Sequence, residues 1–95
     1  MSKRILVVDD DAMNLRMAEM FLKKGNYEVE KAASGEECLA FLQVAMVDLV
    51  LLDVEMPGMN GIETLEELRK REGLEKIPVM FLSASEEIGE KFLKI

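Results

Sequence analysis

The chain has 95 residues, which leaves room for one hydrophobic core, so we expect a single domain over residues 1–95. Apolar residues make up 49% of the sequence and charged residues 33%, a balance that predicts a globular fold and excludes a disordered chain. The formal charge of −7 argues against a nucleic-acid partner, and no apolar run approaches the ~20 residues that a membrane span needs.

Short apolar runs alternate with helical patterns in the first half of the chain. Ile5–Val8 is too short for a helix and rich in β-branched residues, which predicts a buried strand. A helix should follow and stop at Gly25, because apolar residues recur there at three- and four-residue spacing. These residues are Leu15, Met17, Ala18, Phe21 and Leu22. Tyr27–Glu30 alternates with period two, as expected of a half-exposed edge strand, and Ser34 with Glu37 forms a capping-box pattern before a second helix.

The second half of the chain repeats this alternation. Leu49–Leu52 and Val79–Leu82 are apolar runs that predict two more strands, each followed by a helix. The inward faces of these helices are expected to carry Ile62, Leu65 and Leu68, and then Ile88, Phe92 and Ile95. Four strand–helix units with near-continuous apolar strands predict a parallel sheet covered on both faces, which is an open doubly wound α/β fold.

The sulfur-containing residues give two further expectations. Cys38 is the only cysteine, so an intramolecular disulfide is excluded, and with no recognisable signal peptide we expect a cytoplasmic protein. Of the eight methionines, Met17, Met20 and Met80 fall within predicted elements, and we expect them to fill gaps in the core.

Acidic residues follow two of the predicted strands. Asp9, Asp10 and Asp11 come directly after the first strand, and Asp53 comes directly after the third. If these strands are neighbours, the acids converge at the carboxyl edge of the sheet, where ligands bind. At ~5 Å and an effective dielectric near 20, each pair of carboxylates would repel by about 3 kcal/mol, so the cluster needs a cation. Hard oxygen ligands without sulfur or imidazole suit Mg²⁺.

Structural roles are the alternatives for the same acids. Asp10 or Asp11 can cap the first helix by accepting from its free N–H groups, although capping uses only one carboxylate. Asp53 can form an Asx-turn ahead of Pro57-Gly58.

Three segments together resemble the receiver domain of bacterial two-component response regulators: ILVVDDD, LVLLDVEMPGMNG and PVMFLSAS. They occur in the family's order and at its approximate spacing. The resemblance implies that Asp53 is the phosphoacceptor and that Mg²⁺ is held by Asp9, Asp10, Asp53 and the backbone carbonyl of Glu55. It also implies that Ser83 donates its hydroxyl to the phosphoryl group, although Ser83 could instead cap the last helix.

The resemblance also implies a flavodoxin-like strand order, which is 2-1-3-4-5 in the family. This chain matches the order 2-1-3-4, and the fifth strand, its helix and a Lys after that strand have no counterpart up to Ile95, so we expect a C-terminally incomplete domain. Lys91 and Lys94 do not match the position of that Lys. We expect self-association through pairing at the edge of the fourth strand, packing of the uncovered sheet face, or exchange of the terminal helix between protomers.

The implied function is that of a phosphoacceptor signalling domain that takes a phosphoryl group from a histidine kinase or phosphotransfer protein. Its own catalysis would be limited to self-phosphorylation from a phosphodonor and autodephosphorylation. One alternative is a truncated receiver-like assembly module that no longer signals. Another is a magnesium-dependent phosphohydrolase with Asp9 as nucleophile, since Asp9-x-Asp11 satisfies the D-x-D pattern of the haloacid dehalogenase type, although Met13 departs from its usual continuation.

Overall fold

Strands and helices alternate along the chain in the computed structural model, which describes residues 2–82. The strands are β1 (Arg4–Val8), β2 (Glu28–Ala32), β3 (Leu49–Asp53) and β4 (Val79–Leu82). The helices are α1 (Ala12–Lys24), α2 (Gly35–Val44) and α3 (Gly61–Arg69). None of these helices is long and apolar enough to span a membrane. The predicted fourth helix lies outside the described residues.

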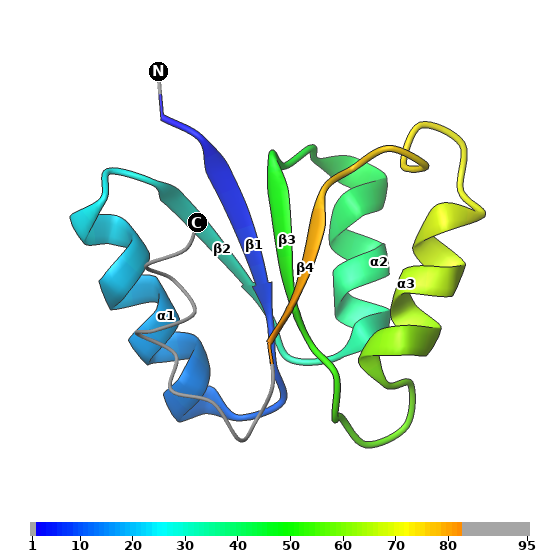
Figure 1. The fold of residues 1–95 in the computed structure, drawn as a ribbon, viewed down its shortest axis with the longest axis horizontal. Coiled ribbons are helices and arrows are strands. Elements are labelled where there is room, and N and C mark those ends of the chain that lie inside the picture. Colours follow the sequence, from blue (N-terminus) through cyan, green and yellow to red (C-terminus); the bar gives the residue numbers. More distant parts are fainter. Residues whose placement is uncertain (1, 83–95) are drawn as a thin grey trace.

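The four strands form one parallel sheet in the order β2-β1-β3-β4 (Figure 1). This confirms the predicted fold class and the expected strand order. β1 and β3 are neighbours, with Val8 paired to Leu52, so the residues that follow them emerge side by side. Asp53 is the last residue of β3 and pairs with Leu82, whereas the sequence pattern placed it just after the strand. Its position is therefore fixed by the sheet itself.

The helices cover the sheet unequally: α2 and α3 lie on one face and α1 on the other (Figure 1). Successive residues of a strand point to opposite faces. Leu6 and Val8 belong to the cluster under α2 and α3, while Ile5 and Val7 belong to the cluster under α1. Burial on both sides explains why β1 and β3 read as continuous apolar runs.

Polar side chains begin each helix. Asp11 caps α1 and accepts from the N–H groups of Met13 and Asn14, which confirms the capping role considered for it. At α2, Ser34 accepts from the N–H of Glu37, but the Glu37 carboxylate accepts from Ala33 instead of completing the capping box. The complete capping box is at α3. There the side chains of Asn60 and Glu63 each accept from the other's backbone N–H.

The structure differs from the sequence-based expectations at β2 and at Ile62. β2 begins at Glu28, one residue later than predicted, and extends to Ala32. Ile62 is 47% exposed, because α3 turns Gly61, Thr64 and Leu68 inward.

The expected core role of three methionines is wrong. Met17 and Met20 are 51% and 60% exposed, since Leu15, Ala18 and Leu22 occupy the inward face of α1. Met80 is also exposed, on β4.

Candidate functional site

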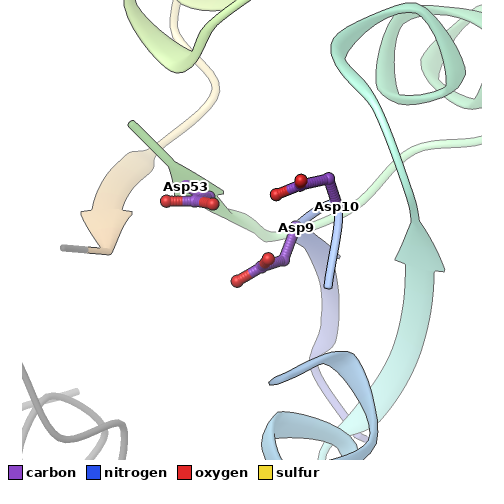
Figure 2. Close-up of side chains that lie close together, drawn as sticks. All are labelled: Asp9, Asp10 and Asp53. Atoms are coloured by element: carbon purple, nitrogen blue, oxygen red, sulfur yellow. The ribbon is translucent and has the colours of Figure 1, made fainter. Parts of the chain in front are cut away.

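Three carboxylates meet at the carboxyl ends of β1 and β3, as predicted. Oxygens of Asp9, Asp10 and Asp53 all lie within 4.8 Å of one another (Figure 2). The side chains of Asp9 and Asp53 are 4% and 5% exposed, whereas Asp10 lies at the surface. The arrangement therefore has two buried acids and one that opens to solvent.

Three hydrogen bonds fix the backbone and the carboxylate of Asp9. Its backbone N–H donates to the carbonyl of Ala32 at 3.1 Å, which ties it to the end of β2. Its Oδ1 accepts from the N–H of Asp11 at 2.9 Å, and its Oδ2 accepts from the side-chain amide of Asn14 at 3.3 Å. Both carboxylate oxygens are thus attached to the start of α1.

The carboxylate of Asp53 accepts fewer hydrogen bonds than the carboxylate of Asp9. Its Oδ1 accepts from the backbone N–H of Glu55 at 3.2 Å, which is the Asx-turn considered as its alternative role. The turn uses one oxygen of the carboxylate and is compatible with a chemical role for the other. This turn begins the loop that connects β3 to α3.

The electrostatics of the cluster disfavour charge on its buried members. Burial raises the pKa of Asp53 to about 6, and the neighbouring carboxylate of Asp9 adds to the effect. Burial also raises the pKa of Asp9, while the Asp11 N–H and the Asn14 amide oppose that rise. Two carboxylates whose charge is disfavoured, joined by a third at the surface, form a site that a cation would stabilise.

The donor set fits Mg²⁺. Only carboxylate oxygens make up the cluster found among residues 2–82, and oxygen ligands at an open edge suit a cation that keeps part of its water shell. Glu55 lies two residues after Asp53 with its side chain exposed, and ligation by its carbonyl stays a prediction. Ser83 lies outside the described residues, so its contact with a phosphoryl group also stays a prediction.

Gly61 brings the first turn of α3 against the end of β3. Its N–H donates to the carbonyl of Val54 at 3.0 Å. A Cβ at Gly61 would overlap the carbonyl oxygen of Asp53 and the Cα of Val54. Only glycine permits this approach without moving one of the two backbones, so Gly61 helps to set where Asp53 lies.

Asn14 and Gly61 are site residues that the sequence reasoning did not assign. The contact of Asn14 had a weak signal, an amide in the first helical turn after the acids. Gly61 had a stronger one, since it closes the M-P-x-M-x-G segment, but the close approach of two backbones is visible only in three dimensions.

Residues 5–94 match the family described as the response regulator receiver domain. Over 84 residues the chain is 39% identical to the transcriptional regulatory protein ResD of Bacillus subtilis (strain 168). That similarity covers 88% of this chain and 34% of ResD, so the chain spans well under half the length of this curated relative.

Solved structures agree with the family match. The N-terminal domain of a response regulator receiver protein from Methanoculleus marisnigri JR1 is 40% identical, with a TM-score of 0.85 over 97% of this chain and 75% of that one. The response regulator protein TrrA from Thermotoga maritima, in complex with Mg(2+)-BeF, is 39% identical. Its TM-score is 0.80 over 86% of this chain and 70% of that one.

Proposed function

Because this chain belongs to the response regulator receiver domain family of two-component systems, we propose that it accepts a phosphoryl group on Asp53. The observation that carries the proposal is the position of Asp53. It is a buried carboxylate at the end of a central strand, within 4.8 Å of two further carboxylates. Structural burial alone gives no reason to gather three acids, whereas phosphoryl transfer needs a nucleophile beside a cation site.

The chemistry follows from the carboxylate of Asp53. One of its oxygens attacks the phosphorus of a phosphohistidine, the P–N bond breaks, and the imidazole leaves with the bonding electrons. The product is an acyl phosphate on Asp53. With a pKa of about 6, Asp53 is largely ionised at neutral pH and can act as the nucleophile. These 95 residues contain no histidine, so the donor imidazole lies outside this sequence.

Receiver domains bind Mg²⁺ at their acidic pocket, and we assign that role in this chain to Asp9, Asp10, Asp53 and the backbone carbonyl of Glu55. When bound, the cation would offset the carboxylate charges and stabilise charge on the phosphoryl oxygens. Asp9 contributes a carboxylate that is already oriented by Asp11 and Asn14. Asp10, at the surface, leaves the entrance to the site open to solvent and phosphodonor.

The experiment that tests this assignment is labelling with a small phosphodonor and Mg²⁺, followed by mapping of the modified residue. Asp53→Asn should abolish the mass increase of one phosphoryl group. Asp11→Asn is the matched control, because it makes the same chemical change next to the cluster and asparagine also caps a helix. Labelling of Asp9, or loss of labelling in Asp11→Asn alone, would contradict the proposal and favour the phosphohydrolase alternative. The two hydrogen bonds that already engage Asp9 argue against that role.

Receiver domains interact with histidine kinases or phosphotransfer proteins, and we propose that this chain meets such a partner in the cytoplasm along α1. Met13, Met17 and Met20 are 67%, 51% and 60% exposed on this helix. They line a groove of about 670 Å³ together with Arg16 and Lys31. Flexible methionine side chains suit a protein contact, and the groove begins at Ala12, directly after Asp11.

A comparison of two phosphodonors separates docking from chemistry. Met17→Ala combined with Met20→Ala should slow transfer from a phosphorylated histidine phosphotransfer protein and leave labelling by a small phosphodonor unchanged. Met46→Ala is the control, since Met46 is equally exposed but lies between α2 and β3. An equal loss with both donors would mean that the α1 substitutions disturb the site itself.

We also propose that this 95-residue chain self-associates along β4. Among residues 2–82, β4 pairs with β3 on one side only, and Met80 of β4 is exposed. An apolar edge strand is a template for pairing with another chain. Light scattering coupled to size exclusion should detect a dimer whose population rises with protein concentration, and a monomer at high micromolar concentration would contradict this.

A further inference from the structure

The side chain of Asn14 reaches from the first turn of α1 to the acidic cluster. Its amide donates to Asp9 Oδ2 at 3.3 Å, and the pair is partly buried. The opposite oxygen of Asp9 already accepts from the N–H of Asp11. Asn14 therefore completes the restraint on a carboxylate whose orientation decides where a cation can bind.

Helix formation does not require this amide. The first turn of α1 is capped by Asp11, which accepts from the backbone N–H groups of Met13 and Asn14. The Asn14 side chain is free of that duty and points instead toward Asp9.

We propose that Asn14 is a positioning residue for the cation site, which holds the Asp9 carboxylate in its binding orientation by a hydrogen bond. The inference rests on the proposed function, in that Asp9 is taken to be a ligand of Mg²⁺. A neutral amide is suited to the task, because it donates a hydrogen bond without competing for the cation. Outer contacts of this kind orient metal ligands, and their loss typically weakens metal binding about 10- to 100-fold.

Calorimetric titration with Mg²⁺ tests the role directly. Asn14→Leu keeps much of the side-chain volume and removes the donor, and should raise the Kd for Mg²⁺ about tenfold. Asn14→Gln restores an amide one methylene further out and should recover part of that loss. At saturating Mg²⁺, labelling by a small phosphodonor should return to near the parent rate, since the defect lies in binding. Met46→Leu, at an exposed position between α2 and β3, should leave the Kd unchanged.

Two outcomes would overturn the proposal. One is an Mg²⁺ Kd for Asn14→Leu within twofold of the parent value, with cooperative unfolding retained. The other is an equal loss in the Leu and Gln variants together with a slower rate at saturating Mg²⁺, which would indicate a general disturbance of α1. If Asn14→Leu did not fold, Asn14→Gln and Asn14→Ala would be titrated in its place. Labelling of Asp53→Asn would refute the phosphoacceptor assignment without affecting these Mg²⁺ titrations.

Discussion

Leu52 and Asp53 are adjacent residues of β3 that are almost equally buried, yet burial affects them in opposite ways. The same contrast holds for Val8 and Asp9 at the end of β1. The apolar pair lies in the core layer beneath α2 and α3. Burial there removes hydrocarbon from water and stabilises the fold.

The acidic pair, one residue further along, experiences the same exclusion of water as a penalty. Its charges are desolvated and face each other across neighbouring strands. The boundary between the apolar core and the acidic site therefore lies between Leu52 and Asp53 on β3 and between Val8 and Asp9 after β1. On the core side of this boundary, burial of apolar side chains stabilises the folded state. On the site side, burial of carboxylates destabilises it, and a bound cation can offset that destabilisation.

The largest change in the free energy of unfolding is expected for a substitution on the core side of that boundary. Leu52→Ala should lower the free energy of unfolding by about 3 to 4 kcal/mol, because Leu52 is fully buried and its removal leaves a cavity. Urea denaturation measures the change. Met46→Ala, at an exposed position, should change stability by less than about 0.5 kcal/mol. A loss under about 1 kcal/mol for Leu52→Ala would show that the layer is not tightly packed.

On the site side of the boundary, a substitution that removes a buried charge should raise the free energy of unfolding. In the absence of divalent cations, Asp53→Asn should raise the free energy of unfolding by about 2 kcal/mol at neutral pH, because it removes a charge whose burial is unfavourable. Asp48→Asn should have little effect, because Asp48 is exposed and the asparagine oxygen can still accept from the Arg4 N–H. Destabilisation by Asp53→Asn would mean that the ionised carboxylate is well compensated in the folded chain.

Added Mg²⁺ should reduce the destabilisation that the buried carboxylates cause. At ten times its Kd, a cation that binds only the folded state stabilises it by about 1.4 kcal/mol, which thermal melts would detect. Asp10→Asn should reduce this gain by removing a ligand. An unchanged response in that variant would exclude Asp10 from the site, and Asp48→Asn should respond like the parent chain.

The smallest expected effect is a pH dependence. The pKa of Asp53 is raised in the folded state, so the folded chain holds that proton more tightly than the unfolded chain does. Stability from this group is present in acid and lost as pH rises through about 6. Between about pH 5 and about pH 7 the metal-free chain should lose about 1 kcal/mol relative to Asp53→Asn. Parallel pH profiles for the two proteins would contradict this prediction.

Most of the fold could be predicted because its signals are local. The buried strands are continuous apolar runs, and the strand order followed from the resemblance to receiver domains. The clustering of Asp9, Asp10 and Asp53 followed from strand order, since residues at the carboxyl ends of neighbouring parallel strands must meet.

What could not be predicted depends on packing between elements. Spacing alone cannot tell which side of a helix faces the sheet when apolar residues occur on both sides, so Ile62 and the methionines of α1 were misplaced. The Asn14 contact has the same origin. It depends on the direction in which α1 leaves β1, which three aspartates in a row do not specify.

The contact of Gly61 with the end of β3 has a mechanical consequence. There is no spare space between the first residue of α3 and the backbone of Asp53 and Val54, and the Gly61 N–H is bonded to Val54. A change at the strand end therefore cannot be absorbed in the gap. A displacement of the Asp53 or Val54 backbone would therefore push on the first turn of α3 directly.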